Sequence, residues 1–254
     1  MSAAHGDALD RELDRWESPA TLWLRDDDAV TATPALDRLI ALAEAAGAPL
    51  ALAVIPAGAD AALAARLARA KDVSVLQHGY AHANHAALGA KKSEYADGRP
   101  LEAMMGELVL GRATIQAVFG EQALPVFAPP WNRAADALIR HLPELGLTGL
   151  SRFKPRAARM PVAGLTEANA HVDLIDWRGG RMGKPAAAVM AEIAAHLAAR
   201  RTGAADPEEA TGILAHHLAM DDGAWDSLRA VLGCLGGDGR IAWARPAALF
   251  ADAP

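Results

Sequence analysis

Two histidines stand four residues apart in the stretch 77–85, directly after the apolar run 73–76. On one face of a helical turn, His78 and His82 could both reach the same metal ion through their imidazoles. The apolar run predicts a buried strand, and ligands gather at the carboxyl ends of strands in α/β folds. The same histidines could instead be polar residues that cap the exit from the strand. The spacing alone therefore leaves a metal site and a strand cap open.

An acidic cluster elsewhere in the chain favours the metal site. Asp26, Asp27 and Asp28 follow the strand candidate 21–24. One carboxylate and two imidazoles form a three-point ligand set that suits Zn²⁺, Co²⁺, Ni²⁺, Mn²⁺ or Fe²⁺. A divalent metal activates water and polarises a carbonyl, a second aspartate can take the proton, and a histidine can protonate a leaving group. These groups together are those of a metal-assisted hydrolase, although the triplet could also cap the helix that begins near Pro34.

The elements that must position these residues alternate along the chain. Short apolar runs alternate with amphipathic helices of about 10–18 residues, a pattern typical of a parallel sheet. Seven or eight such units predict an α/β fold, a single distorted (β/α)7–8 barrel, with an open doubly wound sheet as the alternative. No linker is visible, so residues 1–254 are expected to form one domain, with residues 1–20 as an N-terminal arm or first helix. The strands are predicted at 21–24, 50–55, 73–76, 124–127, 149–151, 171–175, 212–216 and 240–243.

Composition excludes several classes of protein. The 254 residues are 52% hydrophobic and carry a net charge of -6, which argues against a nucleic-acid partner. Cys234 is the only cysteine, so no intramolecular disulfide is possible. Residues 1–16 lack the apolar core of a signal peptide, and no apolar run is long enough to span a bilayer. We therefore expect a cytoplasmic protein without a membrane partner; the sequence does not give the oligomeric state, and a homo-oligomer is compatible with it.

The strand-end motifs resemble those of the polysaccharide deacetylases, carbohydrate esterase family four. This family has distorted (β/α) barrels that remove acetyl groups from sugars with a divalent metal. Its first motif is an Asp-Asp pair, matched here by Asp27 and Asp28. Its second is His-x-x-x-His, matched by His78 and His82. The resemblance implies that Asp27 is the catalytic base and that Asp28, His78 and His82 bind the metal.

Three further motifs follow in the family's order. The stretch 128–131 resembles the third motif and places Pro130 and Trp131 among the substrate-binding residues. The fourth is matched by Asp176 and Trp177, which are also predicted to bind substrate, and the fifth, Leu-x-His, makes His216 the catalytic acid. Tyr80, inside the second motif, is also predicted to contact substrate. The sequence departs from the family at Ala29, where glycine is usual, and in lacking the arginine that leads the third motif; Arg25 or Arg133 would have to replace it.

Several assignments stay open. A shift of one residue would make Asp26 the base and Asp27 the ligand, although Arg25-x-Asp-Asp favours Asp27 and Asp28. His85 is either a third imidazole near the metal or a loop residue. In an extended strand His217 points opposite to His216, so only one of the two faces the pocket. Trp131 and Trp177 either line that pocket or belong to the core.

The sequence thus predicts a metal-dependent hydrolase that removes an acyl group, most simply N-acetyl, from a carbohydrate or related small molecule. Zn²⁺ is the metal expected first. One alternative is a hydrolase of another non-peptide C–N bond in a small cytosolic amide. The other is a sugar-binding protein with a catalytically silent site.

Overall fold

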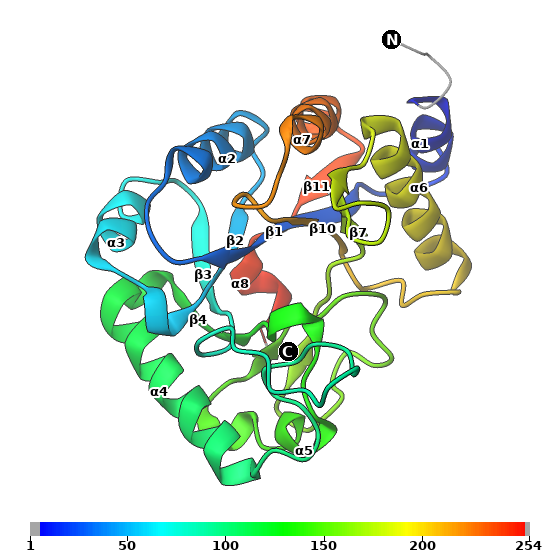
Figure 1. Ribbon diagram of the computed structural model, residues 1–254. Coiled ribbons are helices and arrows are strands. Elements are labelled where there is room, and N and C mark those ends of the chain that lie inside the picture. The colour runs from blue at the N-terminus through cyan, green and yellow to red at the C-terminus, as the bar shows by residue number, and fades with distance from the viewer. Residues whose placement is uncertain (1–5, 252–254) are drawn as a thin grey trace.

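The sheet is parallel throughout and curls into an open barrel (Figure 1). This computed structural model describes residues 6–251. The strand order is β6-β5-β4-β3-β2-β1-β10-β7, with β11 paired to the start of β1. The prediction of a distorted barrel is confirmed, and no pairing between β6 and β7 closes it within the described residues. The strands are β1 (Ala20–Ala29), β2 (Leu50–Val54), β3 (Val73–Gln77), β4 (Ala123–Phe127), β5 (Gly149–Leu150), β6 (Thr166–Glu167), β7 (Val172–Asp173), β10 (Thr211–Ala215) and β11 (Ile241–Trp243).

Most helices cover the outer face of this sheet, whereas the short C-terminal helix 246–249 lies within the ring of strands in the view of Figure 1. Local sequence signals start several of them: Thr33 accepts a hydrogen bond from the backbone N–H of Leu36 at 3.1 Å, and Asp60 accepts one from Leu63 at 2.8 Å. Residues 1–5 of the predicted arm lie outside the described residues, and α1 begins just after them. The helices are α1 (Gly6–Leu13), α2 (Pro34–Ala45), α3 (Ala61–Leu67), α4 (Leu101–Phe119), α5 (Asp136–Ile139), α6 (Ala186–Thr202), α7 (Asp222–Leu235) and α8 (Pro246–Leu249).

Side chains of β1 alternate between the two faces of the sheet. Leu22 and Leu24 belong to the core under the outer helices, whereas Trp23 packs inside the barrel against Phe250, with ring centroids 6.1 Å apart. The same alternation places Arg25 and Asp27 on the inner face. Asp26 therefore points to the opposite face of the sheet from Arg25 and Asp27.

The acidic triplet lies within β1 rather than after it. The predicted strand ended at residue 24, but β1 runs to Ala29 and remains buried through most of its length. Its pairing with β2 shifts register between Asp26 and Ala29, and Asp28 has a φ of 75°. This bulge breaks the alternation, so Asp28 can join Asp27 at the carboxyl edge of the sheet.

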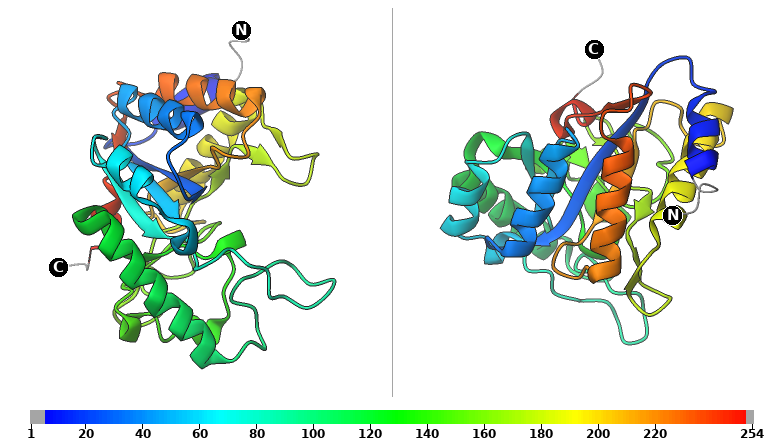
Figure 2. Two further views of the ribbon diagram at one scale, coloured as in Figure 1. Left: turned by 60° about the vertical axis from the view of Figure 1, so that its left-hand side comes forward. Right: turned by 90° about the horizontal axis from the view of Figure 1, so that it is seen from above.

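Two extensions project from the same side of the molecule (Figure 2, left). One is the antiparallel hairpin of β8 (Ile175–Asp176) and β9 (Met182–Gly183); the other is the loop 86–98. A membrane-spanning helix is not found between residues 6 and 251, because none there combines sufficient length with sufficient apolar character.

Candidate metal centre and active site

Asp28, His78 and His82 meet at the carboxyl ends of β1 and β3. The Oδ1 atom of Asp28 lies 3.0 Å from Nε2 of His78 and 3.2 Å from Nε2 of His82. His78 Nδ1 is 2.9 Å from the carbonyl oxygen of Ala128, which can only accept, so this nitrogen carries the ring proton. Nε2 of His78, which faces Asp28, is therefore the nitrogen that can give up its proton and bind a metal. The three side chains have the donor types and the mutual proximity for one divalent cation.

The electrostatics of this triad favour positive charge. Burial raises the pKa of Asp28, but hydrogen bonds from His78 and His82 outweigh burial and hold the pKa well below its ordinary value. Burial lowers the pKa of His78, whereas the charges of Asp27 and Asp28 raise it, and the net pKa is raised. The site thus keeps an anionic carboxylate and stabilises added positive charge, which is the condition for binding a cation.

The histidine loop is not helical, and the predicted helical turn is wrong. Residues 78–85 form an irregular loop with positive φ at Gly79 (63°) and His82 (55°). A Cβ at Gly79 would collide with the carboxylate of Glu94 and the ring of Pro130. Only glycine therefore permits the chain to turn here between His78 and His82.

Glu94 holds this loop in shape, and sequence reasoning missed it. Its buried carboxylate accepts backbone N–H groups from Tyr80 at 3.1 Å, Ala81 at 2.7 Å and Ala83 at 3.4 Å. A carboxylate that collects several N–H groups fixes the backbone as a helix would, without helical dihedrals. Glu94 lies 12 residues beyond His82 in the printed sequence with no motif around it, so no local signal marks it.

Arg25 supplies the guanidinium that the third motif lacks. Its Nε and Nη2 lie 2.9 and 3.0 Å from the two carboxylate oxygens of Asp27, and both side chains are buried. Nη2 also donates to Asn132 at 2.6 Å, and Nη1 donates to Ser151 at 2.7 Å. Arg133, the alternative, is exposed and donates to the carbonyl of Lys92 instead. The structure therefore places Arg25, and not Arg133, against Asp27.

Asp26 and His217 form a separate buried pair. Asp26 accepts the backbone N–H of His217 at 2.8 Å, and its Oδ2 lies 2.6 Å from His217 Nδ1. Burial lowers the pKa of His217, but the Asp26 carboxylate raises it by more. Neither residue belongs to the metal triad. The pair joins the carboxyl ends of β1 and β10, the two strands that carry the predicted base and acid.

His216 faces Asp173 and Trp177. Its Nδ1 lies 4.0 Å from Asp173 Oδ1, and its ring meets the Trp177 ring edge to face at 4.9 Å. Trp177 Nε1 donates to Asp173 Oδ2 at 2.8 Å, and burial raises the pKa of Asp173. Asp176, the predicted acidic residue of this motif, is exposed and accepts N–H groups of its own turn. Asp173, three residues earlier, is the carboxylate beside His216, and it is placed there by the pairing of β7 with β10, which no local pattern shows.

The remaining predicted residues lie around the triad at different depths. The Trp131 ring packs against His82 at 4.3 Å, and Pro130 is buried next to Gly79. Tyr80 is half-buried, and its contact with substrate stays a prediction. His85 is exposed on the loop surface and is not part of the triad.

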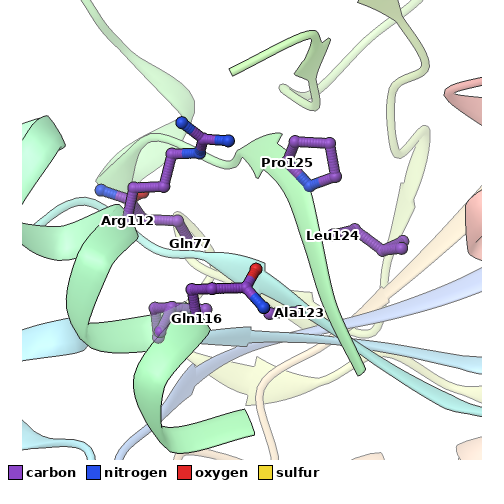
Figure 3. Close-up of a pocket in the computed structure, with 7 residues that line it drawn as sticks. Gln77, Arg112, Gln116, Ala123, Leu124 and Pro125 are labelled. Atoms are coloured by element: carbon purple, nitrogen blue, oxygen red, sulfur yellow. The ribbon is translucent and has the colours of Figure 1, made fainter. Parts of the chain in front are cut away.

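Gln77 connects the histidine loop to α4. Its Nε2 donates to the carbonyls of Gly79 and Leu108, both at 3.1 Å. A cavity of about 130 Å³ lies beside it between α4 and β4, where Figure 3 shows Arg112 and Gln116 from the helix opposite Ala123–Pro125 of the strand. Polar side chains line this cavity as well as apolar ones. Oε1 of Gln77 is buried and has no hydrogen-bond partner within residues 6–251.

A second group of metal-ligand types, His171, His196 and Glu209, lies at the amino ends of β7 and β10. The backbone N–H of Gly212 donates to His171 Nδ1 at 2.9 Å, so the ring proton is on Nε2, 3.3 Å from Glu209. A protonated nitrogen has no lone pair for a metal. This group is therefore a buried hydrogen-bonded network, and the triad at the carboxyl edge remains the candidate metal centre.

Comparison with solved structures shows the same fold. A protein from Mycobacterium smegmatis assigned as a polysaccharide deacetylase matches with a TM-score of 0.65 at 16% identity, over 92% of this chain and 91% of that one. A family 4 carbohydrate esterase from Streptomyces lividans, in complex with acetate, matches with 0.56 at 17%, over 87% and 90%. A family 4 acetyl xylan esterase from Clostridium thermocellum, in complex with a cobalt ion, matches with 0.51 at 13%, over 86% and 85%.

No family model matches the sequence, and no curated protein matches it. The structural matches nevertheless extend over nearly the full length of each partner. The resemblance predicted from the motifs is thus confirmed in the fold: this chain folds as the polysaccharide deacetylases of carbohydrate esterase family four do.

Proposed function

We propose that this protein is a metal-dependent hydrolase that removes an acyl group, most simply N-acetyl, from a carbohydrate or a related small molecule. One observation carries the proposal. Three groups meet at one edge of the barrel, although they come from β1, β3 and β10. They are the ligand triad, the Asp27 carboxylate that Arg25 holds, and His216, which lies beside the carboxylate of Asp173. Their charges act on each other, since Asp27 influences the pKa of His78 and His216 that of Asp28.

Asp28, His78 and His82 would hold the cation. When bound there, a divalent metal supplies Lewis acidity to the acyl carbonyl and to water. Zn²⁺ fits the nitrogen and oxygen donors, and Co²⁺, Ni²⁺, Mn²⁺ and Fe²⁺ remain alternatives. The cobalt ion in the acetyl xylan esterase of this fold supports a divalent transition metal.

The protein's own side chains would move the protons. Asp27 accepts a proton from the attacking water, and the ion pair with Arg25 orients its carboxylate. His216 donates a proton to the departing nitrogen or oxygen, with Asp173 beside its Nδ1. Trp131 and Trp177 flank the place where the acyl group would lie, next to His82 and His216 respectively. The acetate bound by the Streptomyces lividans esterase supports a small acyl group.

Metal content tests the ligand set. We expect about one equivalent of metal in the wild-type protein, and a loss of stoichiometric binding in the Asp28→Ala and His78→Ala variants. His85→Ala is the matched control, because it removes an exposed imidazole from the same loop outside the triad. Unchanged metal content in both triad variants would remove this ligand set.

Substrate tests decide the reaction. The zinc- and cobalt-loaded proteins should release acetate from acetylated oligosaccharides or N-acetylated sugars, and a chelator should abolish the release. If the protein hydrolyses small amides but no acetylated sugar, it is instead a hydrolase of another non-peptide C–N bond. Binding of glycans without turnover, unaffected by chelator, would instead indicate a sugar-binding protein.

A further inference from the structure

A groove of about 420 Å³ lies beside the metal centre, between the loop 86–98 and the segment 132–135. Much of its wall is alanine, which leaves room for a ligand. The charged side chains that line it are Lys91, Arg133 and Arg152 on the basic side and Asp97 on the acidic side. None of the three triad residues lines it. The groove is thus a neighbour of the metal centre and not a part of it.

The groove carries uncompensated positive charge. Arg152 is neutralised by Glu167, which its Nη2 approaches to 2.8 Å. The Arg133 side chain donates from Nη1 to the carbonyl of Lys92 at 3.0 Å, and within residues 6–251 neither Arg133 nor Lys91 forms an ion pair. Asp97 is the single acidic residue of the lining. This local surplus runs against the net charge of -6 of the whole chain, so it marks a preference of the groove rather than of the surface.

The walls are held in place by hydrogen bonds across the groove. Ser93 Oγ donates to the carbonyl of Arg133 at 3.2 Å, and the backbone N–H of Ala135 donates to the carbonyl of Tyr95 at 2.8 Å. These bonds tie the loop 86–98 to the segment 132–135. A ligand would therefore meet a preformed site, which lowers the cost of ordering on binding.

The groove adjoins the catalytic groups through one layer of residues. Asn132, in its wall, accepts a hydrogen bond from Arg25, and Arg25 holds Asp27. Trp131, the residue before Asn132, packs on His82. One small molecule could therefore place an acyl group at the metal centre and another substituent in the groove.

We propose that this groove binds an anionic group, a carboxylate or a phosphate, of the molecule whose acyl group is hydrolysed. The inference rests on the proposed function, and it narrows the substrate to acidic acylated sugars or related acids. Arg133 offers a guanidinium fork that suits carboxylate and phosphate oxygens, and Lys91 adds a second cation. A neutral substrate would leave their positive charge, which Asp97 offsets only in part, without a further counter-charge.

Matched substrates test the proposal. We would compare kcat/KM of the metal-loaded protein for N-acetylglucosamine, N-acetylglucosamine 6-phosphate and N-acetylmuramic acid; the last two separate phosphate from carboxylate. We expect at least one anionic sugar to be preferred, and the preference to weaken as salt is raised. In Lys91→Ala and Arg133→Gln the ratio of anionic to neutral kcat/KM should fall about tenfold each. Arg133→Lys should retain part of the preference, and Lys71→Ala, an exposed lysine at the start of β3, is the control for charge alone.

Two results would overturn the proposal. One is equal kcat/KM for neutral and anionic sugars in the wild-type protein; the other is an anion preference that Lys91→Ala and Arg133→Gln leave intact. If no sugar is hydrolysed, the proposed function fails, but equilibrium titration of N-acetylglucosamine 6-phosphate against N-acetylglucosamine still decides the groove. Tighter binding of the phosphate that is lost in Arg133→Gln supports the site, and equal binding refutes it.

Discussion

Replacing Glu94 with glutamine should weaken metal binding although Glu94 is not a ligand. The carboxylate accepts three backbone N–H groups from the loop that carries His82, and the shortest two of these bonds, to Ala81 and Tyr80, involve different oxygens. In Glu94→Gln one oxygen becomes an NH₂ donor. Whichever way the amide is turned, a donor then faces a backbone N–H, and a buried hydrogen bond to a charged group is lost.

The size of the effect follows from that single bond. A hydrogen bond to a charged group contributes about 1.5–3 kcal/mol, and an unsatisfied buried N–H adds to the loss. If metal binding must supply about 2–3 kcal/mol to order the loop in the variant, the metal affinity falls about 30- to 150-fold. This is close to the range of about 10- to 100-fold typical of residues that support metal ligands from behind.

Chelator competition with Zn²⁺ measures this affinity. Glu44→Gln is the matched control, because Glu44 also accepts a backbone N–H through its carboxylate, from Lys71 at 2.9 Å, but far along the chain from the triad. We expect the control to bind Zn²⁺ as the wild type does. A Glu94→Gln affinity within about twofold of wild type would refute the reasoning, since the loop would then be ordered by other contacts.

Three other predictions concern stability. In Gly111→Ala, the added Cβ would overlap the amide of Gln77, so we expect a loss of about 1–3 kcal/mol in urea unfolding. In Asp26→Asn, the buried partner of His217 loses its charge, and we expect a loss of about 3–5 kcal/mol by the same measurement. Burial and neighbouring basic side chains lower the pKa of His196 from its ordinary 6.5 to about 3. At pH values between these two, the unfolded chain binds a proton that the folded chain does not, so the free energy of unfolding decreases as the pH is lowered. Between pH 7 and pH 4.5, His196→Asn should therefore lose about 2–3 kcal/mol less of its free energy of unfolding than wild type does.

Each of these has a contrary result. An unchanged urea midpoint in Gly111→Ala would show that the amide of Gln77 can move aside. A loss below about 1 kcal/mol in Asp26→Asn would mean that the cost of removing the pair with His217 from water cancels the attraction between the two side chains. Parallel falls of Tm with pH in His196→Asn and wild type would show that other groups cause the acid sensitivity.

The fold and the triad were accessible from sequence because both depend on local patterns. Apolar runs of strand length alternated with helices whose caps, such as Thr33 and Asp60, lie at their first turns. Parallel strands bring their carboxyl ends to one edge, so Asp28 and His78 were expected together although 50 positions separate them. Alternation along β1 also explains why Arg25 faces Asp27 and not Asp26.

What sequence could not supply depends on distant contacts. The histidine loop takes its shape from Glu94 rather than from a periodic pattern, and the expected helical turn was therefore wrong. The acidic residue beside His216 is Asp173 because β7 pairs with β10 through Asp173 and Leu214, which fixes where the strand ends. The motif predicted Asp176 instead, because the order of residues along the chain does not give the register between these two strands.

The same distant contacts explain why the site tolerates an unfavourable backbone. Of the seven non-glycine residues with positive φ in the part of the chain described, four lie at the candidate metal centre: Asp28, His82, Trp131 and Asn132. Each such conformation costs about 1–3 kcal/mol, and glycine would relieve it. Glycine has no side chain, however, to bind the metal, pack on His82 or accept from Arg25. The strain is therefore held by contacts such as those of Glu94 and Arg25, and when these weaken the ligand loops should relax before the sheet unfolds.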